Sequence, residues 1–190
     1  MTLAQDAKPA PIELGHGKIE LEIFMEPTCP FCKRTFEKLP QLVSTFGADK
    51  MTAKIRFVSQ PWHLFSPIVT RSILAASATP GGTETALKAM AHIFENREAY
   101  EFENHCAGPN MHRTPTDIIE SISKGTGVDV AEAFKLKSVD QALRWHAKYG
   151  RQNGIHVSPT FMINGLIDPN MSSGQSVEDW AKLLTPHLQS

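Results

Sequence analysis

The chain lacks several features that would assign it to a class of protein at once. Among its 190 residues there are only three cysteines, and acidic and basic residues nearly balance, leaving a net charge of −1. Three cysteines are too few for a scaffold held together by disulfides. The near-neutral charge argues against broad electrostatic binding to nucleic acid or to an anionic membrane surface. No run approaches the roughly 20 apolar residues that a membrane-spanning helix needs, so we expect no membrane insertion.

The N-terminal segment also lacks a targeting signal. Residues 1–18 contain no apolar core and no arginine, so they resemble neither a secretory signal nor a transit peptide. The sequence as written therefore predicts a cytoplasmic protein. A periplasmic or secreted protein is the alternative if the chain is a mature form that has lost an export signal. The hydrophobic content of 41% and charged content of 21% are those of an ordinary soluble globular protein.

What the sequence does contain is Cys29-Pro30-Phe31-Cys32, placed between two different patterns. The alternating apolar run 19–25 precedes the motif and predicts a strand, and a helical pattern begins at Phe31. Pro30 suits a first helical turn, because its missing N–H has no partner there in any case. A thiol at the start of a helix lies against unpaired N–H groups and the positive end of the helix dipole, which stabilise a thiolate. The motif therefore indicates a thiol–disulfide exchange centre.

Other interpretations of a C-x-x-C motif are half of a zinc site, a structural disulfide or chance. Zinc requires four ligands, and beyond this pair the chain offers only Cys106 with the loosely spaced His105 and His112. We therefore predict no metal site. Cys106 itself is expected to be a buried or idle thiol, because free cysteines are commonly buried.

The order of the predicted elements indicates one α/β domain with a large helical insertion. Residues 1–17 form an extended lead-in, and residues 18–190 form the domain, with the insertion at about 64–153. Its core is a mixed sheet with helices on both faces. Asn164-Gly165, between two short apolar runs, predicts a hairpin. We also expect Trp145 and Trp180, which lie on amphipathic helices, to be buried in the core.

Pieces through nearly the whole chain resemble the DsbA-like branch of the thioredoxin superfamily. They include 24–40, FMEPTCPFCKRTFEKLP, the strand 55–59, the helix 66–78, and 154–165, GIHVSPTFMING, with the last helix after it. The resemblance implies a thioredoxin-like fold and a protein thiol–disulfide oxidoreductase or isomerase that acts on protein or peptide thiols and disulfides. It makes Cys29 the attacking thiolate and Cys32 the resolving thiol, with Pro159 a cis-proline facing them. It implies no cofactor other than the reversible disulfide, with glutathione as a candidate reductant.

The resemblance also implies a groove for the substrate. Val157, Ser158 and Thr160 would lie along it beside the cis-proline. Trp62 and His63 follow the second strand, where family members place groove-lining residues, although a histidine in a turn is the simpler interpretation of His63. Phe31 either forms an exposed apolar edge beside the sulfur or packs beneath the helix.

The chain departs from the family pattern in two ways. Strongly oxidising members often carry Pro-His between the cysteines, and Pro-Phe resembles glutaredoxins more, so the direction of electron flow stays open. The position six residues before the first cysteine, often a buried acid in these families, is Ile23. Glu22 and Glu26 are the nearest carboxylates. Neither is assigned a role in proton transfer, and Glu22 is expected on a solvated strand face.

Two other functions remain open at this stage. One is a glutathione-dependent oxidoreductase or kappa-class-like transferase, although such transferases usually have serine where Cys29 stands. The other is a peptide-binding, chaperone-like module in which oxidation or reduction of the cysteines only switches the binding on or off.

Overall fold

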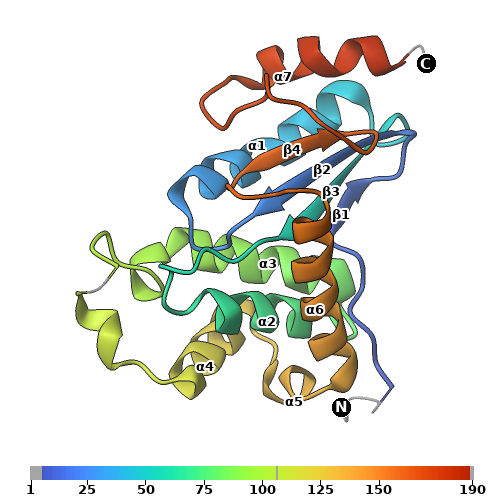
Figure 1. Ribbon diagram of the computed structural model, residues 1–190. Coiled ribbons are helices and arrows are strands. Elements are labelled where there is room, and N and C mark those ends of the chain that lie inside the picture. The colour runs from blue at the N-terminus through green and yellow to red at the C-terminus, as the bar shows by residue number, and fades with distance from the viewer. Residues whose placement is uncertain (1–5, 106, 189–190) are drawn as a thin grey trace.

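The computed structural model describes residues 6–105 and 107–188 (Figure 1). The prediction for Cys106 lies outside the described residues. The strands are β1 (Glu13–Gly15), β2 (Ile19–Met25), β3 (Met51–Phe57), β4 (Thr160–Ile163) and β5 (Leu166–Ile167). The α-helices are α1 (Pro30–Phe46), α2 (Ser66–Ser77), α3 (Gly82–Glu95), α4 (Pro115–Thr126), α5 (Ala131–Phe134), α6 (Lys137–Gln152) and α7 (Val177–Leu184). Short 3-10 turns are η1 (Arg97–Ala99), η2 (Pro109–His112) and η3 (Thr185–Leu188).

The strands form one mixed sheet in the order β1-β3-β2-β4-β5. β2 pairs in parallel with β3, and the other neighbours are antiparallel. β2 lies at the centre and is covered on both faces, which is why Leu21, Ile23 and Phe24 are all buried although their side chains alternate between the faces. Figure 1 shows α1 and α7 together at one side of the sheet and the block of α2–α6 at the other. The predicted mixed sheet with flanking helices is confirmed.

The helical block from α2 to α6 falls within the predicted insertion. Its buried side chains, among them Ile73, Ile93 and Ile118, are continuous with the core of the sheet. α4 begins with Pro115 in its first turn and a capping box between Thr114 and Asp117. Because β2 and β3 are parallel, α1 and the loop 58–65 that leads to α2 leave the same edge of the sheet, which places the block beside the N-terminus of α1, where the cysteine pair lies.

The predicted lead-in contributes a strand to the sheet. β1 pairs antiparallel with β3, so the sheet begins before residue 18. Gly15 has φ 81°, and a Cβ at this position would lie 2.2 Å from the carbonyl oxygen of Met51. Only glycine fits this close approach without moving the backbone.

Two predictions about side-chain environment are wrong. Glu22 is only 5% exposed, and its carboxylate accepts hydrogen bonds from Arg56 Nε at 2.6 Å and Tyr149 Oη at 2.9 Å. Tyr149 belongs to α6, which packs along β3 beside it, so this face of β2 is not solvated. Trp145 is 45% exposed and stacks on Tyr149 at the surface, with ring centroids 4.8 Å apart. Trp180, in contrast, is fully buried as predicted.

Candidate active site

Cys29 stands at the junction between the central strand and the first helix. It is the N-cap residue of α1, with extended backbone angles of φ −78° and ψ 131°, and Pro30 occupies the first helical turn. The helix interior begins with a backbone hydrogen bond from Lys33 to the Cys29 carbonyl at 3.0 Å. In this position the Cys29 sulfur faces the first free N–H groups of the helix, as the sequence pattern predicts.

The two thiols of the motif have opposite electrostatic surroundings. The pKa of Cys29 is lowered to about 6 by a hydrogen bond from the Cys32 thiol and by the backbone N–H groups of Cys32 and Phe31, with a further contribution from Ser158, against the effect of burial. The pKa of Cys32 is raised, because its side chain is fully buried and lies beside Cys29. Both cysteines are free thiols, and no disulfide joins them. The pair therefore consists of a nucleophilic thiolate and a thiol that stays protonated near neutral pH.

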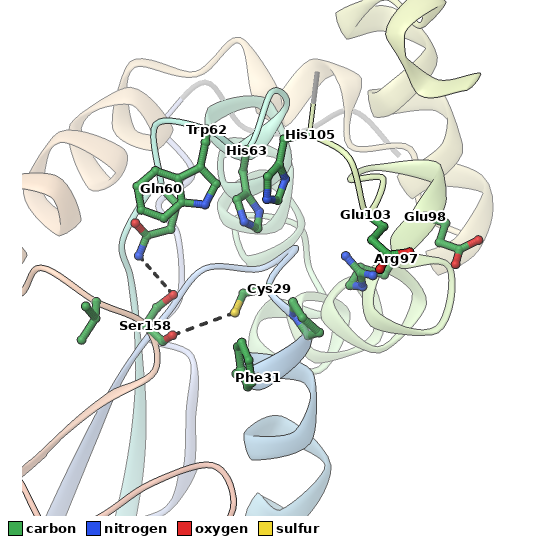
Figure 2. A pocket seen from close by; sticks show the side chains of 12 residues that line it. Cys29, Phe31, Gln60, Trp62, His63, Arg97, Glu98, Glu103, His105 and Ser158 are labelled. Carbon is green, nitrogen blue, oxygen red and sulfur yellow. Dashed lines mark hydrogen bonds between the residues drawn. The ribbon is translucent and has the colours of Figure 1, made fainter. Parts of the chain in front are cut away.

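The loop before β4 brings a second segment to the cysteine pair. The Ser158–Pro159 peptide bond is cis, as the resemblance implies. The carbonyl oxygen of Ser158 lies 3.9 Å from Cys29 Sγ, and Ser158 Oγ accepts a hydrogen bond from Gln60 Nε2 at 3.3 Å (Figure 2). Gln60 thus holds this loop to the end of β3, close to the sulfur.

Cys29 lines a groove of about 630 Å³ between the end of the sheet and the helical block. Three apolar side chains on its rim are well exposed: Phe31 at 50%, Trp62 at 57% and Val157 at 65%. Figure 2 shows Trp62 and Phe31 on opposite sides of Cys29. Of the two alternatives for Phe31, the structure therefore shows the exposed apolar edge. Thr160, which was predicted to lie along the groove, is not among its lining residues, and its hydroxyl donates a hydrogen bond to the carbonyl of Val157 at 2.7 Å.

The far wall of the groove carries four polar side chains, and the sequence predicted a place in the groove for none of them. These are Arg97, Glu98, Glu103 and His105, all from η1 and the segment after it (Figure 2). They lie about seventy residues beyond the cysteine pair in the chain, and only the placement of the helical block brings them to it. No short-range pattern places them in the groove, and the sequence suggested a role only for His105, as a weak candidate metal ligand beside Cys106.

His63 is more than a turn histidine. It is buried, it lines the groove, and its Nδ1 lies 2.6 Å from Thr28 Oγ1. Its pKa is lowered to about 4, chiefly by burial and further by the nearby His105 and Arg97. The imidazole is therefore neutral near pH 7.

Glu26 is the buried acid of this site, although its position in the sequence is not the usual one. Its side chain is fully buried and accepts four hydrogen bonds. Two come from Thr28, through N at 3.2 Å and Oγ1 at 2.9 Å, and the others come from Gln60 N at 3.0 Å and from Ser66 Oγ. Burial nevertheless raises the pKa of Glu26 to about 7. The signal for it was weak, because a glutamate next to a proline after a strand is ordinary in surface turns.

The part of the chain that the structure describes contains no cluster of three or more His, Cys, Asp or Glu side chains arranged to bind a metal ion. Within the same residues, none of the helices has the length and apolar character needed to cross a bilayer.

The sequence profile of the thioredoxin family matches residues 15–185. This chain belongs to the thioredoxin family. A solved structure from Pseudomonas syringae, provisionally described as a protein-disulfide isomerase, is 49% identical and superposes with a TM-score of 0.89 over 94% of this chain and 98% of that one. No curated protein sequence gives a significant match.

More distant solved structures share the fold. Pseudomonas aeruginosa DsbA2 is 17% identical, with a TM-score of 0.65 over 95% of both chains. A periplasmic thioredoxin-like protein from Salmonella enterica serovar Typhimurium is 16% identical, with a TM-score of 0.70 over 98% of this chain and 94% of that one. The predicted thioredoxin-like fold of the DsbA-like type is therefore confirmed. The comparisons give no support to a cytoplasmic location.

Proposed function

We propose that this protein is a thiol–disulfide oxidoreductase that exchanges disulfides with protein or peptide substrates through Cys29 and Cys32. The observation that carries the proposal is the division of roles between the two thiols. Cys29 has a lowered pKa and opens onto a groove, whereas the buried Cys32 has a raised pKa beside it. A nucleophile that lines a groove, with a fully buried thiol behind it, is the arrangement that a two-step exchange requires.

The reaction balances with the two thiols and the substrate alone. The Cys29 thiolate attacks a substrate disulfide, forming a mixed disulfide while the substrate S–S bond breaks and one substrate sulfur leaves. Cys32 then loses its proton and attacks the Cys29 sulfur, which releases the second substrate sulfur and oxidises the pair. The reverse sequence oxidises a dithiol substrate. Because the two cysteines carry the electrons, the proposal needs no bound cofactor, and glutathione would serve only as a small-thiol reductant.

The walls of the groove support an extended polypeptide as substrate. Phe31, Trp62 and Val157 present apolar surface around the sulfur, which suits segments exposed by incompletely folded proteins. The backbone carbonyl of Ser158 beside the sulfur offers an acceptor for a peptide N–H, as in strand addition. A tripeptide such as glutathione would fill only part of a groove of this size.

The lowered pKa of Cys29 also suggests the direction of electron flow. A stabilised thiolate favours the reduced form of the pair, which makes the disulfide a stronger oxidant. The reduction potentials of known dithiol–disulfide centres range from about −270 mV for a reductant to about −120 mV for an oxidant. We expect a potential toward the oxidising end, which suits a disulfide donor in an oxidising compartment such as the periplasm.

The test is a titration of the purified protein in glutathione redox buffers, following the Cys29–Cys32 disulfide by mass after alkylation. A reversible disulfide with an oxidising potential supports the proposal, and a reducing potential would assign a reductase instead. Cys32→Ser should trap a mixed disulfide with a model peptide, whereas Cys29→Ser should trap none and lose activity. If Cys29→Ser keeps full exchange activity, the exchange mechanism is wrong. If wild type shows no exchange activity, and both proteins suppress aggregation of an unfolded protein equally well, the chaperone-like alternative is favoured. Turnover specific to glutathione, with saturable binding, would favour the glutathione-dependent alternative.

A further inference from the structure

A row of hydrogen bonds links the buried Glu26 carboxylate to the groove. Thr28 Oγ1 lies 2.9 Å from Glu26 Oε1 and 2.6 Å from His63 Nδ1. Glu26 and Thr28 precede the cysteine pair, whereas His63 follows β3, so the row joins two separate segments. At the outer end of the row, His63 lines the groove together with Cys29. Figure 2 shows the His63 ring between Trp62 and His105, on the groove wall above Cys29.

The direction in which the protons are donated along this row of hydrogen bonds depends on the charge of Glu26. The backbone N–H groups of Thr28 and Gln60 can only donate to the carboxylate, so only the hydroxyls of Thr28 and Ser66 can reverse. When Glu26 is ionised, Thr28 gives it its single proton and must accept from His63, which places the imidazole proton on Nδ1. When Glu26 is protonated on Oε1, it donates to Thr28, Thr28 donates to Nδ1, and the imidazole proton moves to Nε2.

We propose that Glu26, Thr28 and His63 form a proton wire that exchanges a proton between the buried carboxylate and the groove through a change of the His63 tautomer. This proposal rests on the proposed function. As the Cys29 thiolate attacks a substrate disulfide, the leaving substrate sulfur takes a proton from His63 Nε2. Nδ1 takes the hydroxyl proton of Thr28, and Thr28 takes the proton of Glu26, which becomes ionised. The imidazole is neutral before and after the transfer.

Burial, and next the charges around the wire, keep the stored proton on the carboxyl group rather than on the imidazole. The titratable or charged groups near the wire are the thiols of Cys29 and Cys32 at the start of α1, Arg97 and Glu98 on η1, and Glu101, Glu103 and His105 from the segment after η1. Burial, His105 and Arg97 lower the pKa of His63 to about 4, whereas burial raises the pKa of Glu26 to about 7. A proton donor with a pKa near the working pH is well matched to general acid catalysis.

The test is ¹⁵N NMR of the histidines in the full-length reduced protein between pH 5 and 9, with ¹³C NMR of the Glu26 carboxyl. We expect His63 to change from the Nδ1–H to the Nε2–H tautomer as the pH falls through about 7, in step with Glu26 and with the ring neutral throughout. Thr28→Val should abolish this linkage, and Thr28→Ser should restore it. Ser66→Ala is the matched control, because it removes a hydroxyl from the other carboxylate oxygen, so the tautomer should still follow Glu26.

The kinetic counterpart is single-turnover formation of the mixed disulfide in a Cys32→Ser background. We expect Thr28→Val to slow it by about tenfold or more at pH 7 and Thr28→Ser to restore it. A His63 tautomer that does not change in wild type overturns the wire whether or not the variants fold, and so does a linked change that persists in Thr28→Val. Because the NMR titration uses no substrate, its failure is distinguishable from failure of the proposed function, which would appear as an inactive Cys29.

Discussion

The sulfur of Cys29 lies 3.9 Å from the carbonyl oxygen of Ser158, although 129 positions separate the two residues in the chain. The contact exists because β2 and β4 are paired in the sheet, which brings the loop before β4 to the end of β2. The helical block is inserted between these two segments and supplies the opposite wall of the groove. The site thus depends both on the pairing of β2 with β4 and on an insertion that supplies the groove wall opposite the sulfur.

The acidity of Cys29 should depend on its neighbour in the motif. In the reduced protein we expect the alkylation of Cys29 to show a midpoint near pH 6, because a hydrogen bond from Cys32 is the largest cause of the lowered pKa. Cys32→Ala removes this donor and should raise the midpoint toward that of an ordinary thiol. Cys32→Ser keeps an O–H donor and should raise it less. The measurement is the pH dependence of iodoacetamide labelling by mass, and equal midpoints in the three proteins would show that Cys32 has no such effect.

Trp62 should contribute binding energy for peptide substrates. Trp62→Ala removes a large exposed ring from the rim of the groove, and we expect the KM for an unfolded-protein substrate to rise by about tenfold with little change in kcat. Trp145→Ala is the matched control, because Trp145 is similarly exposed but does not line this groove. Steady-state kinetics of both variants provide the measurement. Equal losses in the two variants would contradict a specific role for Trp62.

The sequence was sufficient to predict those features that depend on local pattern. The junction of strand and helix at Cys29 and the hairpin at Asn164-Gly165 follow from short motifs, and the structure contains both. The cis bond at Pro159 was implied by the family resemblance, and it is also present. Glu22 was misplaced because an alternating strand pattern does not reveal that α6 covers the second face. The polar network around Glu26 was missed for a related reason. Gln60 and Ser66, which bind Glu26, and His63, which binds Thr28, come from a different segment, and only the completed fold brings them to Glu26.

The buried ion pair on the α6 side of the sheet should matter more for stability than its exposed neighbour. Arg56→Met leaves the Glu22 carboxylate buried without its cation, and we expect a loss of about 3 kcal/mol in the free energy of unfolding. Lys54→Met on the same strand breaks a pair with the half-exposed Glu20, for which we expect a loss below about 1 kcal/mol. Urea denaturation gives both values. In the Glu22→Gln/Arg56→Met double variant part of the loss should return, and a double variant no more stable than Arg56→Met would contradict this account.

Acid should destabilise the fold partly through His146, on α6. This histidine is buried against β3, where its Nδ1 accepts a hydrogen bond from the backbone N–H of Phe57 at 3.2 Å. Burial, and next the nearby Arg56, lower its pKa from 6.5 to about 3, so between these values the unfolded chain binds a proton that the folded protein does not. The stability that depends on the neutral imidazole is therefore fully present above pH 6.5 and is lost as the pH falls toward 3.

The cost approaches about 1.4 kcal/mol for each pH unit in that window. His146→Gln keeps an acceptor for the Phe57 N–H but does not titrate, so its free energy of unfolding should fall less steeply between pH 4 and 6, by about that amount per unit. His63, whose pKa is also lowered, contributes equally to wild type and variant and cancels in the comparison. Urea denaturation across this pH range measures the slopes. Parallel curves for the two proteins would mean that His146 does not hold its neutral form in the fold, and the acid sensitivity would then have to come from other groups.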